Sequence, residues 1–229
     1  MKKLLIVLAM VLMFSSTMVI NAAERTTPNP TPEDRSNGFL SELEEKQDAR
    51  FDEAQTKWTR RQTERQTRND KYLEIVAQFS PDLLSSYEAA FDTHDALHAE
   101  LFTTRTRIRT TYSDETKAAL EVLKSDLFAQ ATAGEITWKE ARESLKTFLK
   151  DSKTAFTTLT DAYKAAILDE NSEWEAKVVE IKALHQELRA AIEAEDTDSA
   201  SAIIDELYDY LLQHIEFDQF KLDTMNAIF

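Results

Sequence analysis

Apolar positions recur at steps of three and four residues along most of the chain after residue 38, which is the spacing of one face of an α-helix. The stretch 138–162 is typical, with a stripe formed by Trp138, Ala141, Leu145, Phe148, Ala155, Leu159 and Ala162. Only Pro81 and Gly134 interrupt this pattern, and Ala, Leu, Glu and Lys are abundant throughout. The sequence therefore predicts an all-α fold, in which five to six helices form antiparallel hairpins in a bundle.

Ser80 and Pro81 predict the end of a first long helix, because the residue before a proline disfavours helical backbone angles. We expect this helix to cover 39–78 and a second helix to follow over 82–111. A connection this short makes the two helices antiparallel, and residues whose numbers add up to about 160 should then lie level. The first part of the fold is therefore expected to be a long helical hairpin.

Capping signals divide the next part of the chain. Ser113 predicts the start of a third helix, which ends before Gly134. Thr137 and Glu140 have the spacing of a capping box and predict the start of a fourth helix.

A similar signature predicts a break in the pattern that follows. Ser172 and Glu175 repeat the capping-box spacing, so we expect a break or bend between a fourth and a fifth helix there. A last helix should follow residues 196–199 and run nearly to Phe229.

The N-terminus has the parts of a secretory signal peptide, and we expect that signal to cover 1–23. Two lysines precede an unbroken apolar run over 4–13, and we expect cleavage after Ala22 or Ala23. The alternative is an N-terminal membrane anchor formed by 4–20, which is at the short end of what spans a bilayer. The predicted location is therefore extracytoplasmic, meaning secreted, periplasmic or at the cell surface.

The rest of the chain is expected to have three parts. Residues 24–37 hold three of the four prolines, which predicts a disordered spacer. The long helical hairpin should occupy 38–112, and an acidic helical bundle should occupy 113–229.

The charge balance excludes several classes of partner. The chain has 27 Lys and Arg against 42 Asp and Glu, and its formal net charge is −15. Such a negative net charge opposes binding to nucleic acid. Hydropathy adds a second exclusion, because no apolar run after the N-terminus is long enough for membrane insertion of the mature chain. The chain has no cysteine, so an exported fold must be stabilised by packing and not by disulfides.

Arginines interrupt the apolar stripe of the first helix, which reads Phe51, Ala54, Trp58, Arg61, Arg65, Arg68, Tyr72, Ile75 and Phe79. The hairpin register places Arg65 and Arg68 level with 92–98, where acidic side chains are available, and Arg105 and Arg109 add basic charge to the second helix. Unpaired guanidiniums are costly to bury. We expect a layer of internal ion pairs, a surface for an acidic protein or peptide partner, or an enclosed small-anion site.

The histidines form the second unusual feature of these stripes. His94 and His98 stand four residues apart on one helix face, which is the spacing that lets two imidazoles share a metal ion. His185 and His214 also fall on apolar stripes, so we expect all four to face inward. That arrangement fits either a divalent metal site or neutral core histidines with one hydrogen bond each.

No catalytic motif stands out. A glycine-rich phosphate loop is excluded because Gly38 and Gly134 are the only glycines, and cysteine chemistry is excluded as well. We therefore expect a non-enzymatic binding protein of the cell envelope or secretome, without a cofactor, that holds a protein or peptide partner. The alternatives are a carrier of a metal or small anion at the His and Arg layer, a holdase chaperone or a structural spacer, and a homodimer is compatible with all of them.

Exported helical-hairpin proteins without cysteine include the periplasmic stress chaperones of the Spy and CpxP kind, whose helices open with Leu-Thr-x-x-Gln. The nearest stretches here, 112–116 and 136–140, keep the capping hydroxyl and lack the glutamine. A capping hydroxyl is common at helix starts, so this comparison identifies no family.

Overall fold

The computed structural model describes the backbone of residues 32–229 and the side chains of Ala49 and of residues 51–229. This part of the chain is all-α and contains no strand. Its elements are α1 (Pro32–Phe79), the 3-10 helix η2 (Pro81–Leu83), α2 (Leu84–Ala133), α3 (Trp138–Ala166), α4 (Leu168–Glu193) and α5 (Thr197–Ile228). The predicted fold class, an antiparallel bundle of five to six helices, is therefore confirmed.

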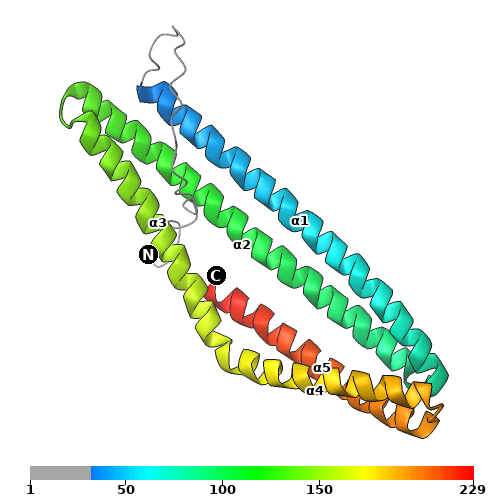
Figure 1. Cartoon of the computed structure of the whole chain (residues 1–229). Helices are drawn as coiled ribbons and strands as arrows, with labels where there is room; N and C mark the ends of the chain where they lie inside the picture. The colour runs from blue at the N-terminus through cyan, green and yellow to red at the C-terminus, as the bar shows by residue number, and fades with distance from the viewer. Residues whose placement is uncertain (1–31) are drawn as a thin grey trace.

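The helices form an elongated bundle (Figure 1). The two longest helices, α1 and α2, make an antiparallel hairpin closed by η2. At the closed end of this hairpin, α5 packs on both α1 and α2, and α4 packs on α5. At the other end, α3 packs on α2, and the end of α5 reaches α3 near the middle of the molecule.

The predicted register of the first hairpin agrees with the structure. The rings of Trp58 and Phe102 stack with their centroids 4.7 Å apart, and Arg65 pairs with Asp95. The numbers in both pairs add up to the expected value. The short connection around Ser80 fixes this register, because a tight turn leaves two antiparallel helices little freedom to slide.

The first helix begins earlier than predicted. Pro32 opens α1, so 32–37 are helical although the sequence predicted a disordered spacer over 24–37. Proline suits the first turn of a helix, where its missing amide hydrogen would have no helical partner in any case. The rest of that spacer and the predicted signal peptide over 1–23 lie outside the described residues.

The predicted helix break at Ser113 is wrong. α2 runs without interruption from Leu84 to Ala133, across the expected boundary between 38–112 and 113–229. Tyr112 and Thr116, one turn apart, are both buried, and the ring of Tyr112 packs 4.9 Å from that of Phe156 on α3. This tertiary packing stabilises a continuous helix, and it outweighs a capping signal worth about 1 kcal/mol.

The capping signals at Gly134 and Thr137 mark helix ends, and the one at Ser172 does not. Gly134 ends α2 in the left-handed conformation, with φ of 76°, and Thr137 and Glu140 form the predicted capping box at the start of α3. The predicted break between the fourth and fifth helices exists, but it lies at Ile167, before Ser172. The Ser172 hydroxyl instead donates to the carbonyl of Leu168 inside α4, over 2.9 Å.

Three apolar clusters form the core. The first closes the hairpin end and contains Val76, Phe79, Tyr87, Leu184, Leu188, Ala191, Ala200, Ile204 and Leu207. The second lies further along α2 and α5 and contains Leu97, Leu101, Leu222 and Met225. The third joins α2 to α3 through Leu120 and Leu149. Between the first two clusters, α2 and α5 carry a polar layer.

Candidate metal-binding site

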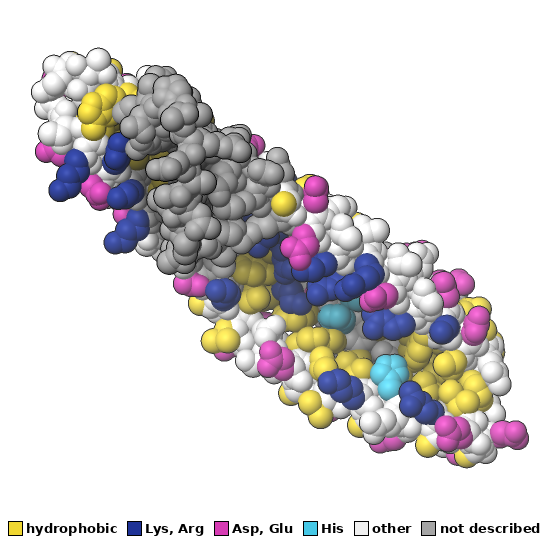
Figure 2. Space-filling model, turned by 45° about the horizontal axis from the view of Figure 1, so that its top comes forward, with side chains coloured by type: hydrophobic (Ala, Val, Ile, Leu, Met, Phe, Trp, Pro, Cys, Tyr) yellow, Lys and Arg dark blue, Asp and Glu magenta, His cyan; other side chains and the backbone are white. Residues whose placement is uncertain are grey.

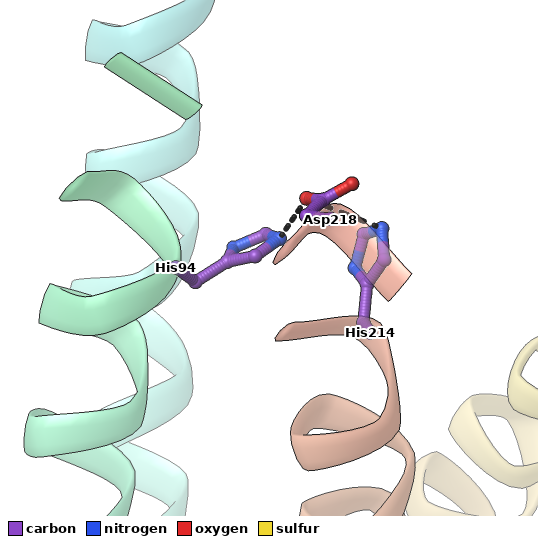
Figure 3. Close-up of side chains that lie close together, drawn as sticks. All are labelled: His94, His214 and Asp218. Atoms are coloured by element: carbon purple, nitrogen blue, oxygen red, sulfur yellow. Dashed lines mark ion pairs between the residues drawn. The ribbon is translucent and has the colours of Figure 1, made fainter. Parts of the chain in front are cut away.

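Two pairs of side chains, each one helical turn apart, form the polar layer between α2 and α5. His94 and His98 come from α2, and His214 and Asp218 come from α5. Because residues four apart lie on one face of a helix, each pair projects in one direction. Figure 3 shows His94 pointing across the helix interface toward His214 and Asp218. The packing of α5 on α2 thus brings together four candidate metal ligands.

The nitrogen atoms of the three imidazoles surround one carboxylate oxygen. Asp218 Oδ2 lies 3.1 Å from His98 Nε2, 3.4 Å from His94 Nε2 and 3.8 Å from His214 Nε2. His94 Nε2 and His98 Nε2 are 3.1 Å apart. The ligand atoms of His94, His214 and Asp218 all lie within 4.8 Å of one another.

These separations suit a small divalent ion. Two donors that each lie about 2.0–2.1 Å from a zinc ion, at the tetrahedral angle, are about 3.3–3.4 Å from each other. Three of these four separations fall within 0.3 Å of that value, and the fourth, from His214 to Asp218, is 3.8 Å. The rings of His98 and His214 are further apart, with centroids at 6.3 Å, so one ring must turn before both bind the same ion.

The carboxylate of Asp218 is buried, and only one of its two oxygens accepts a well-directed hydrogen bond. The residue is 1 % exposed. Its Oδ1 accepts a hydrogen bond of 2.8 Å from Lys221 Nζ, whose ammonium also lies 3.7 Å above the Phe217 ring. Its Oδ2 is buried and lacks a well-directed hydrogen bond, although the Nε2 atoms of His94 and His98 lie 3.4 Å and 3.1 Å from it and lower the pKa of this carboxyl. A buried acceptor without a partner costs about 1–3 kcal/mol, so this oxygen is suited to a ligand.

The ionisation of the cluster also favours a cation. Burial raises the pKa of Asp218, but the nearby nitrogens of His94, His98 and Lys221 outweigh it and hold that pKa well below its ordinary value. Burial lowers the pKa of His214 to about 4, against an opposing effect of Asp218. The site therefore contains an ionised carboxylate and, at His214, a neutral imidazole. These are the forms that bind metal ions.

An aromatic side chain from α4 fixes the orientation of His214. The indole of Trp174 stacks on the imidazole, with centroids 4.3 Å apart and an angle of 11° between the planes. Trp174 also stacks on Phe217, one turn before Lys221. Such packing limits the rotamers of His214, which preorganises the site.

The sequence identified part of this site. It predicted His94 and His98, and it placed His214 on an inward stripe, as the structure confirms. Asp218 was missed, although its spacing of four residues after His214 was a visible signal. The expectation for His185 is wrong, because this residue is exposed and lies beside Tyr72, with ring centroids 5.9 Å apart. Partial burial, aided by Arg189, lowers the pKa of His185.

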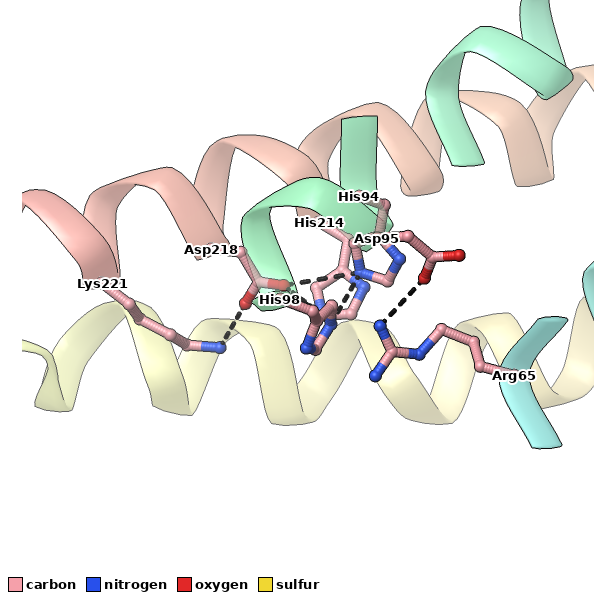
Figure 4. Close-up of polar contacts among 7 residues, drawn as sticks. All are labelled: Arg65, His94, Asp95, His98, His214, Asp218 and Lys221. Atoms are coloured by element: carbon pink, nitrogen blue, oxygen red, sulfur yellow. Dashed lines mark hydrogen bonds and ion pairs between the residues drawn. The ribbon is translucent and has the colours of Figure 1, made fainter. Parts of the chain in front are cut away.

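The arginines of α1 do not all lie in the seam between the helices. Arg65 is 17 % exposed at its side chain and donates to Asp95 Oδ1 over 3.0 Å (Figure 4), which agrees with the expected ion pairing. Arg61 and Arg68 are exposed instead. The neighbouring residues Gln62 and Asn69 are half-buried in their place. An α-helix has 3.6 residues per turn, so the buried face shifts around the helix relative to the predicted stripe.

The remaining predicted contact residues are also on the surface. Arg105 and Arg109 of α2 are exposed, and contact between these arginines and an acidic partner stays a prediction. The six exposed large apolar side chains of the described region are Phe51, Val122, Trp138, Leu168, Val179 and Leu212. They are distributed over all five α-helices, so they define no single docking surface.

Within residues 32–229, no helix combines the length and the apolar character that crossing a bilayer requires. No protein-family model matches the chain, and neither does any curated protein or solved structure. The chemistry of the site is therefore the basis for a functional conclusion.

Proposed function

We propose that this protein binds one divalent transition-metal ion, with zinc the best fit, through His94, His98, His214 and Asp218. The observation that carries the proposal is the buried Oδ2 of Asp218, which lacks a well-directed hydrogen bond and has three imidazole nitrogens within 3.8 Å. A metal ion is the ligand that satisfies all four groups together, because it accepts electron pairs from each of them.

The donor set favours a particular class of metal. Imidazole nitrogens suit zinc, cobalt, nickel and copper(II), whereas calcium and magnesium prefer a shell of oxygens. The chain contains no cysteine, so the site has no thiolate to favour copper(I). Zinc accepts four nitrogen and oxygen donors without a strong preference from its d electrons, which tolerates the spread of distances in this cluster.

The competing interpretation is an internal cluster of ion pairs. In that case a protonated imidazole should donate a well-directed hydrogen bond to Asp218 Oδ2, because this would recover the cost of burying the carboxylate. The geometry supports metal binding better, because the three nitrogens lie near this oxygen without such a bond. The lowered pKa of His214 also disfavours a protonated ring there.

The proposal extends to the role of the protein. Four ligands on two helices that are packed together, without a catalytic motif, support a carrier or a metal-stabilised binding protein and not an enzyme. The basic and apolar N-terminal sequence supports an extracytoplasmic location for this activity.

The test is a zinc titration of the purified chain, with a chelating indicator as competitor. We expect one zinc ion per chain. His94→Gln and His214→Gln each remove a ligand. Loss of an outer-shell partner weakens metal binding by about 10–100-fold, and we expect each of these variants to lose more than that. His185→Gln is the matched control, since it removes a histidine outside the cluster, and it should bind zinc normally. Unchanged binding in His214→Gln, or equal loss in His185→Gln, would contradict the proposed site.

A further inference from the structure

The charge of Asp218 is already matched before any metal binds. Lys221 lies one turn further along α5, and its ammonium is 2.8 Å from Asp218 Oδ1. The side chain of Lys221 is 17 % exposed, so its charge is largely withdrawn from water. On the other side of the imidazoles in Figure 4, Arg65 is matched in the same way by Asp95. Both carboxylates next to the candidate site are therefore paired with a cation.

A divalent ion adds two positive charges to this balanced environment. Neutral imidazoles contribute no charge, and the one ligand carboxylate is shared with Lys221. The loaded site therefore has an excess of two positive charges in a partly desolvated position, which is costly unless an anion compensates it. Among the described residues, Asp218 is the carboxylate that forms ion pairs with the three imidazoles.

The site has an accessible side on which an anion can bind. His94 is 10 % exposed at its side chain, whereas His98 and His214 are 30 % and 27 % exposed. Figure 2 shows histidine side chains on one face of the molecule, with Lys and Arg side chains near them. Basic side chains grouped on one face attract anions even though the whole chain is acidic.

We infer that the loaded site also binds a small oxyanion, such as phosphate or a carboxylate, as a co-ligand of the metal on this accessible side. The inference rests on the proposed metal-binding function and specifies what that site holds. The oxyanion binds the metal through one oxygen and compensates the excess charge next to Lys221 and Arg65. Zinc allows this, because it can expand from four to five donors or exchange a protein ligand for an external one.

Metal and oxyanion must then increase each other's affinity by the same factor, because binding free energies are linked reciprocally. Couplings between two ligands are commonly about 5–150-fold, and we expect about tenfold here. Without the metal, the site should bind the oxyanion weakly, because each cation already has a carboxylate partner.

The test measures the zinc affinity of the full chain in a weakly coordinating perchlorate buffer. The measurement is repeated with phosphate, acetate or chloride at equal ionic strength. Each value is corrected for the zinc that the free anion binds. Lys221→Met should still bind zinc, although the loss of this partner of Asp218 changes the affinity. Phosphate and acetate should raise its zinc affinity by a smaller factor than in the native chain, because the cation next to the site is gone. Lys153→Met on α3, an exposed lysine away from the site, is the matched control. Cobalt(II) provides a second readout, because its visible spectrum should change when the oxyanion joins its coordination shell.

The outcomes separate this inference from the proposed function. Enhancement by phosphate and acetate but not by chloride, reduced in Lys221→Met, supports an oxyanion co-ligand. An equal increase of zinc affinity in chloride would contradict an oxyanion as the co-ligand. Zinc binding that no anion changes overturns the inference and leaves the metal site intact. Failure to bind zinc in any buffer overturns both.

Discussion

The Nε2 atoms of His94 and His98 lie 3.1 Å apart, directed at each other from successive turns of α2. Two imidazoles can share a contact this short when one nitrogen donates and the other accepts, or when both direct their lone pairs at a cation. Asp218 Oδ2 lies within 3.4 Å of both nitrogens. A cation between these three atoms would use the lone pair of each of them, and the first prediction tests this.

Replacement of Asp218 by asparagine should lower stability without metal and should also remove the stabilisation by zinc. In EDTA, Asp218→Asn leaves Lys221 without its carboxylate partner, and we expect the free energy of unfolding to fall by about 1–3 kcal/mol. With zinc at a hundred times its dissociation constant, the native chain should gain about 2.7 kcal/mol, and the variant should gain almost nothing. Urea unfolding followed by circular dichroism measures both quantities. An equal gain from zinc in the two proteins would show that the carboxylate is no ligand.

The Arg65–Asp95 pair should be a weak stabiliser. The two side chains are 17 % and 35 % exposed, and partly exposed ion pairs contribute about 0.2–1 kcal/mol. A double-mutant cycle with Arg65→Gln and Asp95→Asn should give a coupling energy in this range, which decreases at high salt. The fully exposed pair of Lys146 and Glu143 is the reference and should give less. A coupling several times larger would mean that this ion pair organises the hairpin.

Helix capping should matter at one threonine and not at the serine that looked equivalent in the sequence. Thr137→Ala removes the capping box of α3, in which the threonine hydroxyl accepts from the Glu140 amide over 3.2 Å, and should cost about 1 kcal/mol. Ser113→Ala falls inside the continuous helix α2, so it removes no helix cap and should cost less than Thr137→Ala. Thermal unfolding of the two variants gives the comparison. A larger loss at Ser113 would indicate a helix end there after all.

Alkaline destabilisation should depend in part on Tyr72 of the first hairpin. Burial raises the pKa of Tyr72 to about 12, against the smaller opposing effect of its contact with the Tyr87 hydroxyl. The native state therefore keeps the phenol proton that the unfolded chain loses near its ordinary pKa of 10.0. This contribution to stability is complete below pH 10 and is lost as the pH rises toward 12.

The matched variant is Tyr72→Phe, which keeps the ring and removes the ionisable group. Its free energy of unfolding should fall less between pH 10 and pH 12 than that of the native chain, by up to about 3 kcal/mol. Identical pH dependence in the two proteins would mean that Tyr72 ionises normally in the folded state.

The sequence by itself determined the features that depend on local geometry. Residues four apart on a helix face the same way, so the pairing of His94 with His98 could be predicted from their spacing alone. The short connection after Ser80 determined the hairpin register, and with it the contact between Arg65 and Asp95. The glycine at 134 and the capping box at Thr137 marked helix ends that the structure has.

Only the tertiary structure decided the features that depend on how helices far apart in the sequence pack. Burial of Tyr112 against α3 continued the helix through Ser113, because packing outweighs a local capping preference. The rotation and register of α5 on α2 decided that His214 and Asp218 join the two histidines of α2, whereas the packing of α4 leaves His185 exposed. Periodicity shows that a residue faces a core, but it does not show which residue lies opposite, because that choice depends on packing between helices more than a hundred residues apart.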